Sequence, residues 1–389
     1  MRSSCIVWLT AAVGCSALLS GCGGKDSTGP ITPKAVAVVN GNGQTGPGGD
    51  DLPDSLRVVV TGSNDAALAG ATITWAVTAG GAYVSPLTST TNANGETATL
   101  VSLGPVGTVT VTATVAGLAP ATFTATAADP CGWLHALSLG QTATGQLRQY
   151  DCQLSDNSFI DFYELPVSGQ QALGIRLTSA SFNAFIWFFD LAGLVGVNND
   201  TTTSANTNSF FKLVAAPGDY VIGANSLFGN EMGPYTLRAA TTNQSEENCE
   251  EVWLTRGVTT AQVLSTTDCA AAGPSYSDAF WVVLYSGDSL DVKASTLAFD
   301  AQLQLDTLNT AGSLAPVASD DSVGGTHLTY TATVSNFYLL EASAMTVGGH
   351  GAYTLTLAAP AASAAVATRP RILASPRLFS KLSRRSLKR

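Results

Sequence analysis

The cysteines are the residues of this chain whose number and spacing bear most directly on chemistry. Of seven, Cys5 and Cys15 lie in an apolar N-terminal stretch and Cys22 follows it directly. Four remain, in two pairs spaced by 21 and 20 residues: Cys131, Cys152, Cys249 and Cys269. An even number of cysteines in an exported chain favours disulfides over free thiols. Of the three connectivities, we favour Cys131–Cys152 with Cys249–Cys269, because each bridge then lies inside one internal repeat.

Zinc is the alternative use of these thiols. It is disfavoured because the sequence has no Cys-x-x-Cys pair, and because the three histidines are scattered at His135, His327 and His350. The same scatter argues against a hydrolase, which needs a nucleophile and a base in one site. Gly287-Asp288-Ser289 is interpreted as a turn. We therefore expect a non-enzymatic chain.

The N-terminus has the composition of a secretion signal. Arg2 precedes an apolar stretch, Ile6 to Leu19, that ends in small residues and is too short for a permanent membrane span. Leu19-Ser20-Gly21-Cys22 resembles the lipobox of bacterial lipoproteins, which implies cleavage before Cys22 and a lipid on its thiol. The alternative is an ordinary secretion signal with an incidental cysteine. In lipoproteins generally, Asp after the lipidated cysteine favours the inner membrane, so Gly23 predicts the outer membrane or cell surface.

Acidic side chains are the remaining candidates for a site. Four aspartates could converge as oxygen ligands for Ca²⁺: Asp300, Asp306, Asp320 and Asp321. No complete twelve-residue calcium loop is present, and the alternative is that these residues make turns.

Charge is divided unevenly along the chain. Residues 22–360 contain nine basic residues and all 28 acidic ones, a net charge of −19, whereas residues 369–389 contain eight basic residues and no acid. An acidic body argues against a nucleic-acid partner. The basic tail, 360–389, is expected to be disordered or weakly helical.

Residues 34–129, after a flexible tether at 22–33, alternate apolar residues with threonine. Ile73, Trp75 and Val77 give one such strand, and Asn94-Gly95 marks a turn. The phrases AGATITWAVTAGGAYVS (69–85), TTNANGETAT (90–99) and GTVTVTATVAGLAPATFTATA (107–127) resemble invasin/intimin-type bacterial Ig-like domains. The resemblance implies a spacer or adhesive module with Trp75 in its core.

Residues 130–242 and 247–359 repeat each other. Cys131 and Cys249 are 118 residues apart, and Asp161 and Asp278 are 117 apart, as are Phe182 and Phe299. An offset kept over 100 residues indicates a duplicated domain, and each copy is long enough for its own core. Alternating runs predict β-sandwiches. Trp187, Phe188 and Phe189 could form a carbohydrate platform, but we favour a strand in the core, with alternation placing only part of this run outside.

The copies resemble the pre-peptidase C-terminal type of bacterial sandwich. The resemblance rests on Asp, Gly, Phe-Asn/Asp-Ala and Gly-x-Tyr-x-Leu elements at corresponding positions, including 182–184 with 299–301 and 233–237 with 351–355. Such domains usually accompany secreted peptidases, and some are linked to calcium or to insoluble polymers. No peptidase module is present in this sequence.

The sequence therefore predicts an all-β chain of three tandem sandwiches, one Ig-like and two duplicated and jelly-roll-like, after a signal helix at 1–21. We expect a lipid-anchored envelope protein that presents these domains for adhesion or binding to a polysaccharide or protein ligand, with the membrane contacted through its N-terminal lipid. The alternative is a polymer-binding accessory protein, calcium-dependent or not, that serves a separate secreted hydrolase.

Overall fold

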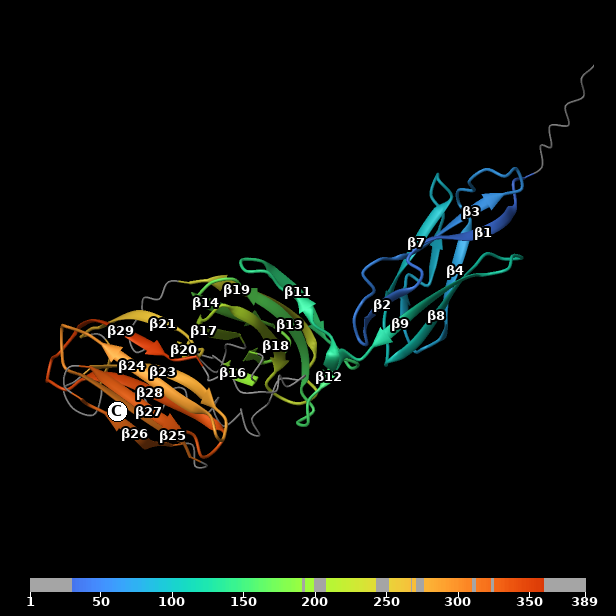
Figure 1. The fold of residues 1–389 in the computed structure, drawn as a ribbon. Helices are drawn as coiled ribbons and strands as arrows, with labels where there is room; N and C mark the ends of the chain where they lie inside the picture. Colours follow the sequence, from blue (N-terminus) through green and yellow to red (C-terminus); the bar gives the residue numbers. More distant parts are fainter. Residues whose placement is uncertain are drawn as a thin grey trace, which may run out of the picture.

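A computed structural model describes residues 30–190, 193–198, 208–242, 252–266, 268–270, 276–309, 313–322 and 325–359. The signal peptide, Cys22 and the basic tail therefore lie outside the described residues. Within them the chain is almost entirely β-structure, as predicted, and the modules follow one another from the N-terminal to the C-terminal end (Figure 1).

The first module, here called the Ig module, is a sandwich of two sheets. One sheet has the order β1-β3-β7-β5: Pro33–Asn40, Leu56–Gly62, Glu96–Ser102 and Tyr83–Ser85. The other has the order β2-β9-β8-β4-β6: Gln44–Pro47, Ala121–Ala128, Gly107–Thr114, Thr72–Ala79 and Thr88–Thr90. Valine and threonine alternate along these strands, so one face of each sheet is buried and the other is wet.

The core of the Ig module forms around a tryptophan. Trp75 is fully buried, its ring lies 6.0 Å from that of Phe123, and its indole N–H donates to Ser89 Oγ at 2.8 Å. This core contains no residue from the other modules. Trp75 is thus the core tryptophan that the resemblance implied.

Repeat 1 (130–242) has a six-stranded sheet that faces four strands of a larger one. The six are β10-β13-β18-β15-β16 with β12 on β13: His135–Ala136, Phe159–Val167, Gly218–Ser226, Ala184–Asp190, Gly193–Asn198 and Cys152–Gln153. The four are β11-β19-β14-β17: Thr142–Leu147, Gly233–Thr241, Gln171–Thr178 and Ser209–Ala215. A single 3₁₀ turn, η1 (Pro130–Gly132), opens the repeat.

Repeat 2 (247–359) has the same arrangement. One layer is β20-β23-β28-β25-β26 with β22 on β23: Val252–Leu254, Tyr276–Leu284, Asn336–Ala344, Ala301–Leu308, Leu314–Asp320 and Cys269–Ala270. The other is β21-β29-β24-β27: Thr259–Leu264, Gly351–Leu357, Ser289–Ser295 and Thr326–Thr331.

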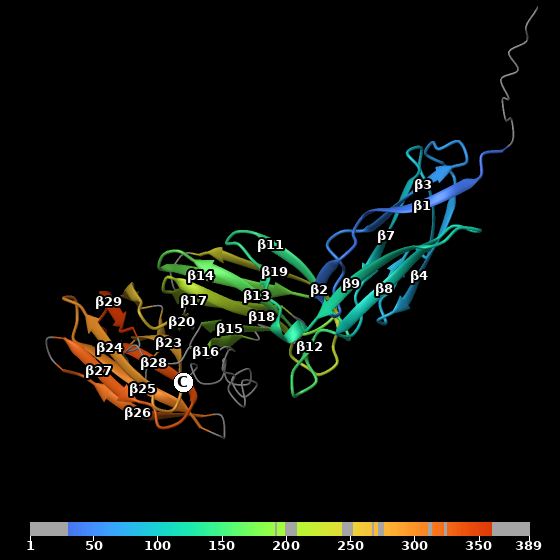
Figure 2. The same ribbon diagram turned by 45° about the vertical axis from the view of Figure 1, so that its right-hand side comes forward.

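Strand β20 joins the two repeats into one ten-stranded sheet. It pairs in parallel with β17 of repeat 1 and in parallel with β23 of repeat 2 (Figures 1 and 2). Trp253 on β20 enters the core of repeat 1, where its ring lies 5.5 Å from that of Phe211 and 6.0 Å from that of Trp281. Gly196 makes room, since a Cβ there would lie 2.6 Å from the indole. The core of repeat 1 therefore includes side chains of repeat 2, while most buried residues of repeat 2 form a core of their own.

The aromatic strand β15 does not alternate between buried and exposed side chains. Trp187, Phe188 and Phe189 are all buried, so the predicted partial exposure is wrong. Phe188 stacks on Phe211 at 5.5 Å, on the side of the repeat that meets Trp253, and the Trp187 indole N–H donates to Asn225 Oδ1 at 3.0 Å. Both faces of the strand are covered by protein.

Candidate functional site

The junction between the Ig module and repeat 1 holds the densest group of ionisable side chains among the described residues. Residues 48–51, between β2 and β3, lie against Tyr150 and Asp151. A Cβ on Gly48 would lie 3.0 Å from Gly104 O and 3.5 Å from Tyr150 O. Gly49 has φ +96°, and a Cβ there would lie 2.1 Å from Asp151 Oδ1. Two consecutive glycines thus let the loop approach the next module closely.

Arg148 binds this loop. Its Nη1 donates to Gly49 O at 2.6 Å and to Asp51 Oδ1 at 3.1 Å, and its Nη2 donates to Asp51 Oδ2 at 3.0 Å. The hydrogen bond from Arg148 lowers the pKa of Asp51. Bidentate contact fixes the orientation of the two groups as well as their distance, so this pair sets how the Ig module sits on repeat 1.

His135 faces the same loop. Its Nε2 lies 3.4 Å from Asp50 Oδ2, and its ring lies 5.2 Å from that of Tyr163. Burial lowers the pKa of His135 and raises the pKa of Asp50. Desolvation thus opposes the charges that would make the pair an ion pair.

Behind this surface, buried carboxyl and phenol groups form a chain. Tyr235 Oη donates to Asp161 Oδ2 at 2.5 Å and lies 2.8 Å from Tyr163 Oη. Burial raises the pKa of Asp161 to about 7. Burial, followed by the neighbouring charge of Asp161, raises the pKa of Asp151 to about 8. Perturbed carboxyl groups are common in active sites. The equivalent residues of the second repeat indicate whether this hydrogen-bonded group is catalytic or structural.

The second repeat contains the same pairing, which argues for a structural role. Tyr353 Oη donates to Asp278 Oδ2 at 2.6 Å, at the position of Tyr235 and Asp161. Asp151 Oδ2 accepts from Arg148 N at 2.5 Å, and Asp268 Oδ2 accepts from Ser265 N at 2.5 Å. A group that recurs in both copies belongs to the fold. Arg148 and the two glycines, in contrast, are specific to the junction.

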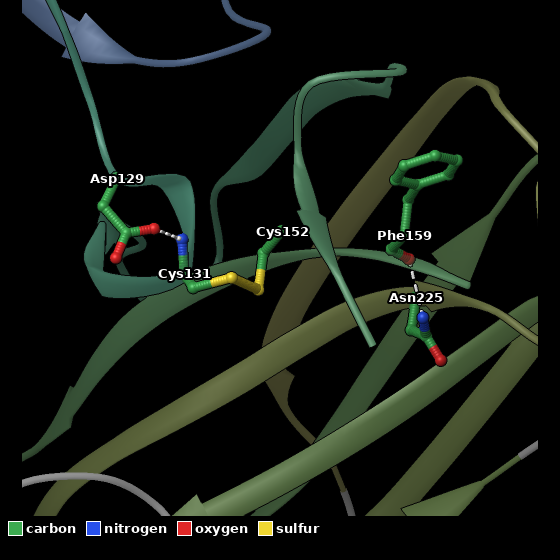
Figure 3. Close-up of a disulfide and its surroundings, with 5 residues drawn as sticks. All are labelled: Asp129, Cys131, Cys152, Phe159 and Asn225. Atoms are coloured by element: carbon green, nitrogen blue, oxygen red, sulfur yellow. Dashed lines mark hydrogen bonds between the residues drawn. A yellow bond between two sulfur atoms is a disulfide. The ribbon is translucent and has the colours of Figure 1, made fainter. Parts of the chain in front are cut away.

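A disulfide staples the start of repeat 1, next to this junction. Cys131 in η1 is bonded to Cys152 in β12, and Asp129 Oδ1 accepts from Cys131 N at 3.0 Å (Figure 3). Nearby, Asn225 Nδ2 donates to Phe159 O at 2.6 Å (Figure 3). The predicted bridge Cys131–Cys152 is confirmed. Its counterpart, Cys249–Cys269, lies outside the described residues, since Cys249 and the side chain of Cys269 are not described.

The four calcium candidates are not gathered into one site. Asp306 is buried on β25 and accepts from Gln304 Nε2 at 3.0 Å, opposite Pro316. Asp320 ends β26 and accepts from Ser322 Oγ and His327 N, each at 2.8 Å. Asp300 precedes β25, and Asp321 is exposed after β26. Over the described ranges no group of three or more His, Cys, Asp or Glu side chains could hold a metal ion.

The three histidines contact different partners and do not meet in one site, as the sequence indicated. His135 faces Asp50, His327 Nε2 lies 3.0 Å from Asp291 Oδ1, and His350 Nδ1 lies 2.8 Å from Gly348 O. Asp288 lies in a turn, where its Oδ2 accepts from Tyr285 N at 3.1 Å and contacts Arg256 Nη2 at 3.3 Å. No helix in the described part of the chain is both long and apolar enough to cross a membrane.

The comparison with protein families assigns the first module. Residues 38–128 match the model of the bacterial Ig-like domain (group 1). The first module is a bacterial Ig-like domain. No curated protein matches the chain significantly.

Several solved structures resemble parts of the chain. The pre-peptidase C-terminal domain of a Bacillus anthracis collagenase aligns at 14% identity over 28% of this chain and 94% of its own, with TM-score 0.22. The D0-D1 domain of intimin aligns at 14% identity over 57% and 94%, with TM-score 0.22. FdeC, an Escherichia coli adhesin, aligns at 14% over 86% and 91%, with TM-score 0.21. Scores this low carry no argument about function.

Sequence reasoning missed the junction. From its sequence alone, the Gly-rich stretch 41–49 is typical of a surface loop, and neither it nor Arg148 is among the predicted site residues. A signal was present, because Gly48-Gly49-Asp50-Asp51 places two acids after two glycines, and Arg148 is one of only nine basic residues in 22–360.

Proposed function

We propose that this chain is a lipid-anchored protein of the bacterial envelope that holds two fused β-sandwiches away from the membrane for adhesion or binding, without enzymatic activity. The supporting observation is that specific contacts hold both module junctions. Arg148 and the glycine loop join the Ig module to repeat 1, and strand β20 joins the two repeats. A rigid series of sandwiches suits a spacer that presents its distal part. The proposed anchor, Cys22, is eleven positions before β1.

The anchor is tested by Cys22→Ser with Cys15→Ser as the matched control, since both cysteines lie in or beside the signal. The wild type and Cys15→Ser are expected in the membrane fraction. The mass of their mature N-terminal peptide is expected to include the attached acyl chains. Cys22→Ser is expected to lose the acyl-modified N-terminal peptide. An unmodified N-terminus away from Cys22 in the wild type would refute the anchor.

The binding role is tested on the full mature chain carrying Cys22→Ser, which removes the lipid. Adhesion to cells or immobilised envelope components, with no hydrolysis of peptide or polysaccharide substrates, is the expected result. Binding to a polysaccharide array that disappears with a chelator would favour the accessory protein instead.

A further inference from the structure

Apolar side chains are exposed to solvent in equivalent loops of the two repeats. In repeat 1 the loop between β18 and β19 exposes Phe228 and Met232, 52% and 45% accessible. In repeat 2 the equivalent loop, between β28 and β29, exposes Met345 and Val347, the latter 73% accessible. Phe228 and Met345 are 117 residues apart, the offset of the duplication. The loop between β24 and β25 adds Leu297, which is fully exposed.

The two loops of repeat 2 are held together. Met345 N donates to Asp300 O at 2.8 Å, and a Cβ on Gly351 would lie 2.5 Å from Ala298 Cβ. In repeat 1 Leu227 N donates to Asn183 O at 2.7 Å, which joins the loop after β18 to the loop before β15 in the same way. We call these two loop pairs the apolar tips.

Strand directions place both tips at one end of the ten-stranded sheet. Strands β17, β20 and β23 are parallel to one another. Strand β14 is antiparallel to β17 and to β19, and β28 is antiparallel to β23 and to β25. The end of β14, the start of β19, the end of β28 and the start of β25 therefore share one end of the sheet.

The surroundings of the tips are acidic. The tip loops and the strand ends and loops next to them carry carboxylates at Asp156, Glu231, Asp300, Asp320 and Asp321. The tip loops themselves, 179–183, 227–232, 296–300 and 345–350, contain no lysine or arginine. Such a rim repels anionic surfaces.

We propose that the apolar tips of the two repeats insert into the surface of a lipid bilayer whose headgroups carry no net charge. Four of the five exposed tip residues are Leu, Val or Met, which suit acyl chains, and the fifth, Phe228, is also typical of side chains that insert at the bilayer interface. The acidic rim selects against anionic lipid. This proposal names a class of partner for the proposed binding function. It rests on that function only because it requires the repeats to be accessible to a partner.

Vesicle co-sedimentation of the full mature chain carrying Cys22→Ser is the test, since the lipid anchor is then absent. Phosphatidylcholine vesicles are expected to bind the protein better than vesicles containing phosphatidylglycerol. Leu297→Ser with Val347→Ser is expected to weaken binding by about tenfold or more, because each exposed side chain loses its burial in the acyl region. All these positions are loop residues in solvent, so folding is expected to survive, and circular dichroism checks it.

Val334→Ser is the matched control. Val334 is 51% exposed in the loop before β28, at the opposite end of repeat 2, so its change is expected to leave binding unaltered. Equal binding by the tip variant and the control, preference for anionic vesicles, or no binding to phosphatidylcholine would each overturn the proposal. None of these results bears on the anchor, which the mass of the mature N-terminal peptide tests separately.

Discussion

Asp161 shows how burial inside repeat 1 raises the pKa of a carboxyl group. Burial raises its pKa from 3.8 to about 7, and the hydrogen bond from Tyr235 lowers it only in part. In the unfolded chain the group has its ordinary pKa, so between about pH 4 and 7 the folded state binds the extra proton. The stabilisation by this proton is full below the unfolded pKa and is lost as the pH rises through the folded one.

Asp161→Asn is therefore expected to flatten the decline in the stability of the repeats between pH 5 and 8. Each held proton contributes a slope of at most about 1.4 kcal/mol per pH unit. Urea midpoints at four pH values measure this. Some slope is expected to remain, because Asp151 has a pKa raised to about 8. Exposed Asp219→Asn controls for the loss of one carboxylate, and an unchanged slope in Asp161→Asn would contradict the assignment.

Gly49 is a second residue whose identity the junction requires. Its φ of +96° suits glycine, and a Cβ would collide with Asp151 Oδ1. Gly49→Ala is expected to displace the loop and to cost about 1–3 kcal/mol locally. Small-angle scattering should then show a changed mean arrangement of the Ig module and repeat 1. Gly43→Ala is the control, since Gly43 also has positive φ but nothing within 4 Å of a Cβ. Identical scattering from both variants would exclude this role.

At the scale of elements, the disulfide closes a loop that carries β10 and β11. Cys131 and Cys152 are 21 residues apart, and the loop between them also supplies His135 and Arg148 to the junction. Replacing both cysteines with serine is expected to destabilise repeat 1 by about 3 kcal/mol in the chain-entropy account. Denaturant unfolding followed by tryptophan fluorescence measures the loss. The Ig module has no cysteine, so a parallel loss in its own transition would argue against a local effect.

Elements that alternate in sequence were predictable, whereas elements shaped by a neighbouring repeat were not. Trp75 and the threonine strands of the Ig module follow from period-two patterning, since each strand has one wet face. The burial of Trp187 and Phe189, on the face of β15 opposite Phe188, could not be foreseen from alternation, and neither could the entry of Trp253 into the core of repeat 1. A trace of this contact is present: Val214 is buried against repeat 2, whereas its counterpart Thr331, 117 residues on, is exposed. A single sequence does not say which of such differences is an interface.

For the whole molecule, we expect two cooperative units rather than three, because the two repeats share one sheet and exchange core side chains. The Ig core is self-contained, whereas the core of repeat 1 includes Trp253, Trp281 and Phe337 of repeat 2. Strand β20 extends one sheet through both repeats. Since cooperativity follows shared burial, we expect one unfolding transition for the Ig module and one for the two repeats together.

Trp253→Ala tests this coupling. Removing the indole leaves a cavity between the repeats, expected to cost about 3–5 kcal/mol, and lowers the repeat transition while the Ig transition stays in place. Trp75→Ala, the matched change in the other unit, is expected to do the reverse. Calorimetry of the full mature chain separates the two. Three resolved transitions in the wild type would mean that the repeats fold independently, and the continuous sheet would then contribute little to the rigidity that the proposed spacer needs.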